Sequence, residues 1–263
     1  MRLIAFLKLS ISFSIIAFLF LACGRGPIYK SVAEEKMKSE IQYIGFDNQS
    51  IIRYAISNDK EFLYIRLEAM SRPTVLKVIQ SGFYLYIDTL GKRNKVMYFN
   101  YPIGNTDQLF QAKLFEENKK ENPAEVGKLK LESQIKDVPQ DALFVANGVE
   151  ESVVNDIEKG FAFKIVSGEY GSLNYYAAIR LDRIKKGGFE SLDRFTIGII
   201  SGAFKRPNIP GSGAGGSRRS RGRYGNMNRV PQSQANYDPE KMRDMYLMSQ
   251  PINFWINVEL NKK

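Results

Sequence analysis

The chain has 263 residues and a formal net charge of +10, and 44% of its residues are hydrophobic, including 14 tyrosines and 17 phenylalanines. This composition is typical of a protein with a packed interior. The sequence holds no histidine, which excludes Ser-His-Asp and Cys-His catalysis, histidine-ligated zinc or iron, and haem bound through histidine. A single cysteine cannot pair within the chain, so the core must hold without a disulfide.

The first 22 residues have the pattern of a bacterial export signal. Arg2 and Lys8 stand near the start, and an apolar and small-residue run extends from 9 to 22. A basic region followed by an apolar region of this length is typical of a secretory signal and is short for a membrane span. We therefore expect a signal peptide over 1–22.

The segment 20–23, Phe-Leu-Ala-Cys, resembles the lipobox of bacterial lipoproteins, in which the cysteine becomes the lipidated first residue of the mature protein. The resemblance implies a lipid on Cys23 and a location in the cell envelope, at the outer membrane. The charged segment that follows is interpreted as a tether over 23–40. The alternative is an ordinary signal peptide that happens to contain a cysteine.

From residue 41 onward, the predicted elements are mostly strands. Alternating or β-rich runs occupy 41–46, 51–57, 62–69, 83–88, 95–101, 142–146, 161–165, 175–181, 195–199 and 252–260. Short helical patterns begin near Pro73, after Thr106 and at Pro239, and residues 128–132 alternate between polar and apolar types. Many short strands with regular turns make sandwiches or barrels. The runs 83–88 and 95–101 are expected to form a hairpin.

Several short motifs occur in the order found in a known superfamily. They are Ser57-Asn58-Asp59, Leu63-Tyr64-Ile65, Tyr86-Ile87-Asp88, Gly91-Lys92, Tyr101-Pro102, Ala178-Ile179-Arg180-Leu181, Ile197-Gly198-Ile199 and Trp255. Over 41–260 this order resembles the family-nine carbohydrate-binding module superfamily, including its uncharacterised bacterial lipoproteins. The resemblance implies an all-β, antiparallel two-sheet β-sandwich of the immunoglobulin or jelly-roll kind, as one domain over 41–263. It also implies a noncatalytic module that binds carbohydrate.

The candidate ligand-binding residues lie on the polar faces of predicted strands: Trp255, Tyr84, Tyr86, Asp88, Tyr64 and Arg66. An indole on a polar sheet face can stack on a sugar ring while nearby amides and carboxylates bind hydroxyl groups. If the strands carrying Tyr64 and Tyr86 are neighbours, their side chains make one surface for a glycan or a protein. The alternatives are that Trp255 only covers the sheet and that tyrosine–arginine packing between strands is structural.

A long insertion at about 203–237 is rich in glycine, arginine, serine, asparagine and proline, and is expected to be a disordered loop. Residues 205–229 hold seven basic residues and no acidic one. The candidate polyanion contacts there are Arg218, Arg219, Arg221 and Arg223. Lipopolysaccharide phosphates and acidic glycans fit such a loop, whereas export argues against nucleic acid. A tolerated, solvated insertion is the alternative.

No catalytic site is predicted. The glycine pattern at 211–216 lacks the preceding strand and following helix that a dinucleotide site requires. No carboxylate pair, nucleophile elbow or metal-binding carboxylate run stands out, so no enzyme activity, cofactor or metal is expected. The alternative to a carbohydrate-binding module is a structural lipoprotein that binds an envelope protein and whose basic loop contacts membrane or polyanions. A hydrolase is the third possibility.

Overall fold

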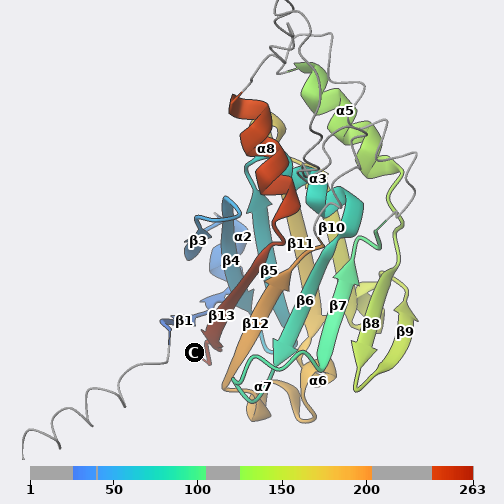
Figure 1. Cartoon of the computed structure of the whole chain (residues 1–263). Helices are drawn as coiled ribbons and strands as arrows, with labels where there is room; N and C mark the ends of the chain where they lie inside the picture. Colours follow the sequence, from blue (N-terminus) through green and yellow to red (C-terminus); the bar gives the residue numbers. More distant parts are fainter. Residues whose placement is uncertain (1–25, 40, 105–124, 203–238, 263) are drawn as a thin grey trace, which may run out of the picture.

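The computed structural model describes residues 26–39, 41–104, 125–202 and 239–262. Within these ranges the chain is mostly strands in two sheets, with few helices, as expected for a β-sandwich (Figure 1). The export signal, Cys23, the helix expected after Thr106 and the arginine-rich insertion lie outside the described residues.

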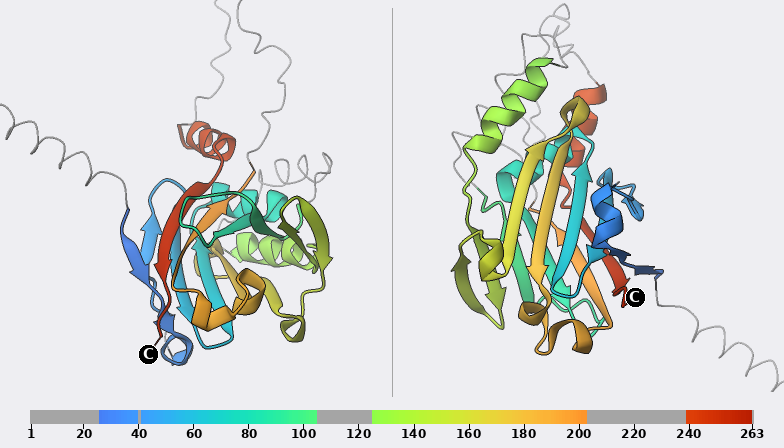
Figure 2. Two further views of the ribbon diagram at one scale, coloured as in Figure 1. Left: turned by 90° about the horizontal axis from the view of Figure 1, so that it is seen from below. Right: turned by 180° about the vertical axis from the view of Figure 1, so that it is seen from behind.

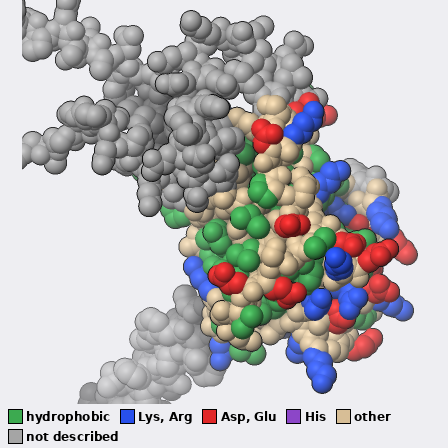
Figure 3. Space-filling view, turned by 90° about the vertical axis from the view of Figure 1, so that its right-hand side faces the viewer, with side chains coloured by type: hydrophobic (Ala, Val, Ile, Leu, Met, Phe, Trp, Pro, Cys, Tyr) green, Lys and Arg blue, Asp and Glu red, His purple; other side chains and the backbone are tan. Residues whose placement is uncertain are grey.

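The larger sheet, sheet A, has seven strands. In spatial order they are β1 (Ile28–Lys30), β13 (Asn253–Glu259), β12 (Arg194–Ile200), β6 (Phe83–Asp88), β7 (Met97–Tyr101), β8 (Ala142–Ala146) and β9 (Val149–Val153). The expected hairpin of β6 and β7 is confirmed, with Tyr86 opposite Tyr98. Edge strand β9 exposes Glu150 and Glu151, and charges on an edge strand discourage further strand pairing. Figure 3, which views this side, shows hydrophobic side chains among acidic and basic ones.

The second sheet, sheet B, has six strands. They are β10 (Phe161–Ser167), β11 (Leu173–Arg180), β5 (Phe62–Ala69), β4 (Ile52–Asn58) and β2 (Val32–Ala33), with β3 (Gly45–Asp47) also paired to β4. The strand expected at 41–46 is therefore shorter and begins later. The right-hand view of Figure 2, turned by 180° from Figure 1, shows the outer face of sheet B in front and sheet A beyond it.

The core lies between the two sheets and is built by the alternation along each strand. Leu63, Ile65 and Leu67 of β5 are at most 1% exposed, because successive side chains of a strand point to opposite faces. The aromatic ring of Phe83 in sheet A meets that of Tyr175 in sheet B edge to face, with ring centroids 5.2 Å apart. Burial of each such side chain contributes about 1.5–3 kcal/mol to folding.

Most helices lie at the ends of the two sheets, whereas α2 (Glu34–Ser39) packs on the outer face of sheet B. The others are α3 (Arg72–Ser81), α5 (Glu125–Lys136), α6 (Leu181–Ile184), α7 (Gly188–Ser191) and α8 (Pro239–Ser249), with single turns η2 (Ile157–Lys159) and η3 (Glu169–Gly171). Residues 128–132, in which polar and apolar types alternate, form part of α5. Leu131 and Ile135 of this helix are four residues apart, so they share one helix face, and both pack on the core. Among the described ranges, no helix is long and apolar enough to cross a membrane.

The expected tether is wrong over residues 28–39, which belong to the fold. Strand β1 pairs in parallel with β13 of sheet A, and β2 pairs in parallel with β4 of sheet B. The Ser31 hydroxyl, between these two strands, donates to Asn58 Oδ1 at 2.5 Å and to the Glu259 carbonyl at 3.2 Å. This N-terminal segment therefore links one edge of each sheet, and its two parallel pairings depart from the fully antiparallel pattern expected.

Candidate functional site

Four aromatic side chains gather on the outer face of sheet A, and we call them the aromatic row: Trp255, Tyr84, Tyr86 and Tyr98. Gly198 of β12 lies opposite Trp255 of β13 on one side and opposite Tyr86 of β6 on the other. Tyr86 in turn lies opposite Tyr98 of β7. Because residues directly opposite one another share a face of the sheet, these positions form one line across four strands. Figure 1 views the sheet from this side.

Gly198 determines how the indole lies. A β-carbon placed on Gly198 would be 2.8 Å from Cη2 and 2.9 Å from Cζ2 and Cζ3 of Trp255. The indole therefore lies over the backbone of β12 and reaches toward Tyr86, whose ring centroid is 6.2 Å away with the two planes at 33°. Glycine provides this close approach because it has no side chain.

The tyrosines continue the row from β6 to β7. The ring centroids of Tyr86 and Tyr98 are 5.0 Å apart, and those of Tyr84 and Tyr98 are 5.6 Å apart. All three tyrosines are partly exposed. The row crosses three intervals between strands, which is about 14 Å at the usual strand spacing. Lys95 Nζ lies 5.6 Å from the Tyr86 ring centroid, within the range of a cation–π contact.

Burial raises the pKa of the Tyr86 and Tyr98 hydroxyl groups. Neighbouring tyrosines add to the effect at Tyr86, and the charge of Glu150 followed by Tyr84 adds to it at Tyr98. Both phenols are thus neutral near pH 7 and can donate or accept a hydrogen bond. The Thr196 hydroxyl, on β12 in the same face, is buried without a hydrogen-bond partner among the described residues. The row therefore combines aromatic planes with neutral hydroxyl groups and one nearby ammonium group.

The three polar side chains that share the outer face of β13 with Trp255 have different roles. Asn257 Nδ2 donates to the carbonyl groups of Gly26 at 3.1 Å and Pro27 at 3.3 Å, and so holds the start of the described chain. Glu259 accepts a hydrogen bond from Arg194 at 2.7 Å. Asn253 is exposed at the other end of β13. Among the described residues, the Asn257 and Glu259 side chains have hydrogen-bond partners within the fold, whereas the Asn253 side chain has none.

Asp88 does not extend the row. Its buried carboxylate accepts hydrogen bonds from the backbone N–H groups of Leu90 at 2.9 Å, Lys92 at 2.6 Å and Asn94 at 3.0 Å. A carboxylate that satisfies three backbone donors stabilises the turn between β6 and β7. The expectation of a ligand contact from Asp88 is therefore not supported by its geometry.

Tyr64 and Arg66 lie on the other sheet, so the surface expected to join them with Tyr84 and Tyr86 does not exist. Their strand, β5, pairs with β4 and β11 of sheet B. The Tyr64 hydroxyl donates to Asp59 Oδ2 at 2.7 Å, and the Arg66 guanidinium binds Glu34. Both side chains are therefore held by contacts within the fold, and Tyr64 also lines a hollow of sheet B.

Sheet B has a separate hollow of about 420 Å³ on its outer face. Ala162 and Ala178 are among its lining residues, with Tyr64, Lys164 and Tyr176 around them. Lys164 lies opposite Tyr176, and Ala162 lies opposite Ala178. The small side chains leave the space between the larger ones.

Tyr98 and Gly198 are not among the site residues that the sequence predicts. The alternation over 95–101 places Tyr98 on the same face as Tyr86 once the hairpin is known, so the signal was present. In the sequence, Gly198 stands out only within a motif of the superfamily resemblance, because a sequence does not show which side chain lies over a glycine.

The described part of the chain contains no group of three or more histidine, cysteine, aspartate or glutamate side chains that could hold a metal ion. Comparisons of the chain with protein-family models, curated proteins and solved structures found no match. The functional assignment therefore rests on the geometry of the aromatic row.

Proposed function

We propose that this protein is a noncatalytic binding module of the cell envelope and that the aromatic row of sheet A binds carbohydrate. The observation that carries the proposal is the placement of the Trp255 indole over Gly198, next to Tyr86. An indole held over a glycine presents a broad apolar surface beside polar groups, which is the combination that an amphipathic ring ligand requires.

The chemistry of a sugar fits this surface. The C–H groups on one side of a pyranose ring can pack on an aromatic plane, while its hydroxyl groups exchange hydrogen bonds with phenols and amides. Neutral Tyr86 and Tyr98 hydroxyl groups and the Asn253 amide are available at the row for such bonds. Because the rings extend across four strands, we propose an oligosaccharide ligand.

We further propose that a lipid on Cys23 holds the module at the outer membrane. Cys23 precedes Gly26 by three residues, a reach of at most about 11 Å. Gly26 is bound by Asn257, two residues from Trp255 on the same face of β13. A lipid at Cys23 would thus be joined by a short segment to the edge of the sheet that carries the row.

We also propose that the sandwich is of the immunoglobulin or jelly-roll kind. The mainly antiparallel pairing of its strands supports this proposal.

The test begins with a glycan-array screen of the mature protein in detergent, followed by titration of the best ligand. Trp255 is the one tryptophan of the chain, so intrinsic fluorescence reports on this site directly. We expect Trp255→Ala to weaken binding about tenfold, because an aromatic contact contributes about 0.5–1.5 kcal/mol and tenfold is 1.4 kcal/mol. Binding by this variant is measured by calorimetry.

The matched control is Tyr176→Ala, which removes a partly exposed aromatic side chain from the outer face of sheet B. An equal loss of glycan affinity in Trp255→Ala and Tyr176→Ala would contradict a site at the aromatic row. Shortening of a labelled polysaccharide during the titration would contradict the noncatalytic part of the proposal. If no glycan binds, the structural or protein-interaction lipoprotein becomes the better proposal.

A further inference from the structure

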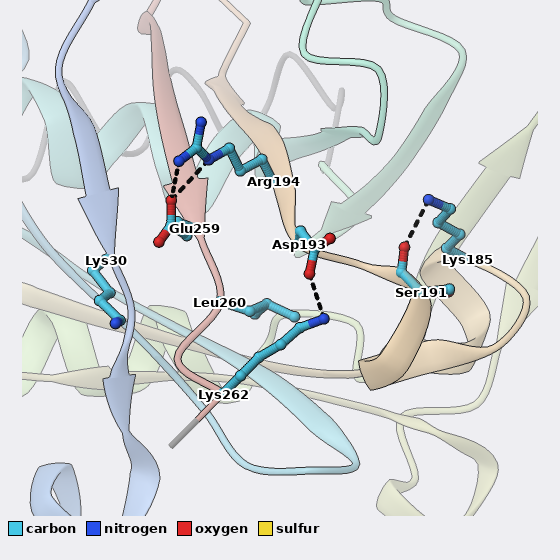
Figure 4. Close-up of a pocket in the computed structure, with 8 residues that line it drawn as sticks. All are labelled: Lys30, Lys185, Ser191, Asp193, Arg194, Glu259, Leu260 and Lys262. Atoms are coloured by element: carbon cyan, nitrogen blue, oxygen red, sulfur yellow. Dashed lines mark hydrogen bonds and ion pairs between the residues drawn. The ribbon is translucent and has the colours of Figure 1, made fainter.

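A second candidate site lies at one end of the two-sheet fold. A hollow of about 710 Å³ opens between β1, β12, β13 and the turn at α7 (Figure 4). Six of its lining side chains are charged: Lys30, Lys185, Arg194, Lys262, Asp193 and Glu259. Four of the six are basic, so the hollow has an excess of positive charge.

The two carboxylates do not neutralise all four cations. Arg194 pairs with Glu259, and Lys262 pairs with Asp193 (Figure 4). Lys185 Nζ donates to the Ser191 carbonyl at 2.8 Å, which is a neutral acceptor. Lys30 has no hydrogen bond or ion pair within the described part of the chain. Two ammonium groups are therefore left without a carboxylate.

The effect of these cations is visible at Asp193. Its hydrogen bond from Lys262, together with the charges of Lys262, Lys185 and Arg194, holds the pKa of the Asp193 carboxyl below its usual range. Three cations of the hollow, Lys262, Lys185 and Arg194, thus stabilise the negative charge of the Asp193 carboxylate. An additional anion entering the hollow would be attracted by the same groups.

We propose that this hollow binds a phosphate group, with Lys30 and Lys185 as its principal ligands. The two lysines lie on opposite sides of the hollow, with Asp193 and Lys262 between them (Figure 4), so a phosphate at its centre would accept from each through a different oxygen once the flexible lysine side chains turn inward. Arg194 and Lys262 add positive charge from their paired positions. The site is distinct from the aromatic row, because the hollow is lined by Asp193, Arg194 and Glu259 at the far end of β12 and β13 from Asn253.

The position of Lys30 suggests where the phosphate comes from. Lys30 follows Cys23 by seven residues, so a lipid on Cys23 would lie within about 25 Å of it along an extended chain. Anionic lipid headgroups would then be within reach of the hollow. This choice of source rests on the proposed lipid anchor, whereas the phosphate site itself does not.

The first experiment measures the binding of inorganic phosphate to the mature protein in detergent by ³¹P NMR titration. We expect the double variant Lys30→Glu/Lys185→Glu to bind phosphate about tenfold more weakly, since each reversal replaces an attraction with a repulsion. Lys92→Glu/Lys164→Glu changes the net charge equally at exposed positions outside the hollow and should bind as the unaltered protein does. Asp193→Asn should bind phosphate more tightly, because the change removes a negative charge from the lining of the hollow.

The second experiment identifies the source by amine labelling of Lys30 and Lys185, read by mass spectrometry. The protein is placed in nanodiscs of phosphatidylcholine with or without phosphatidylglycerol. Protection that increases with phosphatidylglycerol supports a lipid headgroup, and protection by inorganic phosphate alone supports a soluble phosphate compound. No protection in any arm, or equal phosphate affinity in both double variants, would overturn the site. Glycan binding measured in parallel tests the aromatic row separately.

Discussion

Arg66 on β5 donates to both carboxylate oxygens of Glu34 on α2, at 2.5 Å to Oε1 and 3.1 Å to Oε2. Their side chains are 14% and 5% exposed. The Ser57 hydroxyl joins the pair, donating to Glu34 Oε2 and accepting from Arg66. A buried charge pair with these hydrogen bonds attaches α2 to sheet B.

The first prediction concerns this pair. Glu34→Ala leaves the Arg66 guanidinium buried without its partner, and we expect the free energy of unfolding to fall by about 3–5 kcal/mol. Urea denaturation followed by circular dichroism measures it. Arg180→Ala is the control, because Arg180 and Asp182 form an exposed pair, and loss of an exposed, solvent-screened pair should lower the free energy of unfolding much less than loss of the buried one. An equally small fall in the free energy of unfolding in both variants would contradict a strong attachment of α2 by this pair.

The second prediction concerns Gly198. In Gly198→Ala the new methyl group would meet the indole of Trp255 at under 3 Å, so the indole must move away from β12. We expect a red shift of tryptophan emission, as the ring becomes more exposed, and weaker glycan binding with Trp255 still present. Gly26→Ala, where the added carbon would make only an ordinary van der Waals contact of 3.5 Å with Asn257 Nδ2, controls for a general effect of alanine. Unchanged emission in Gly198→Ala would contradict the described position of the indole.

The third prediction concerns Lys77 on α3, which is 4% exposed and donates to the carbonyls of Leu247 at 2.9 Å and Gln250 at 2.8 Å, at the end of α8. Desolvation lowers its pKa from 10.5 to about 8. Between pH 8 and 10.5 the unfolded chain keeps a proton that the folded chain has lost, so this residue makes stability rise with pH. We expect the change in melting temperature from pH 7.5 to 9.5 to be more positive in the unaltered protein than in Lys77→Met. Parallel pH profiles for the two proteins would disprove the shift.

The fourth prediction concerns alkaline unfolding. Burial and a hydrogen bond to Glu68 raise the pKa of Tyr43 from 10.0 to about 12. Below pH 10 this phenol is neutral in both states, and above pH 10 only the unfolded chain ionises, so its contribution to stability is lost as pH rises toward 12. Tyr43→Phe should be less sensitive to pH than the unaltered protein when urea denaturation is compared at pH 9 and 11. An identical pH dependence in the two would contradict the expected role of Tyr43.

The fifth prediction concerns the anchor. Cys23→Ser should abolish acylation, which is measured by incorporation of a labelled fatty acid, and the protein should accumulate as an uncleaved precursor or a soluble form. A processed and acylated Cys23→Ser protein in the membrane fraction would exclude the lipobox interpretation. Cell fractionation of the two proteins provides the comparison.

The sequence predicted which face of each strand is buried far better than which strands are neighbours. Alternation correctly placed Leu85 in the core and Tyr86 on the outer face, because period two is a local property of the chain. It could not assign Tyr64 and Tyr86 to different sheets, since strand order depends on pairing between distant segments. For the same reason it placed Trp255 on the correct face without showing that Gly198 lies beneath it.

The N-terminal segment was missed for a related reason. Strands β1 and β2 have three and two residues and no alternation to detect. Their pairing depends on partners such as Glu259, whose carbonyl lies 228 residues along the chain from the Ser31 hydroxyl that it binds. Local composition suggested a solvated tether, whereas the backbone hydrogen bonds to β13 and β4 make the segment part of the sheets.

The pairing of the first strand with the last also has a consequence for how the chain acquires its structure. A chain is synthesised from its N-terminus, so β1 is made long before β13 exists for it to pair with. Contacts between such distant segments slow folding, because a large loop must close before they form. The edge of the protein nearest its start is therefore the last to be completed, and a chain truncated before β13 would leave β1 without its partner and exposed to proteases.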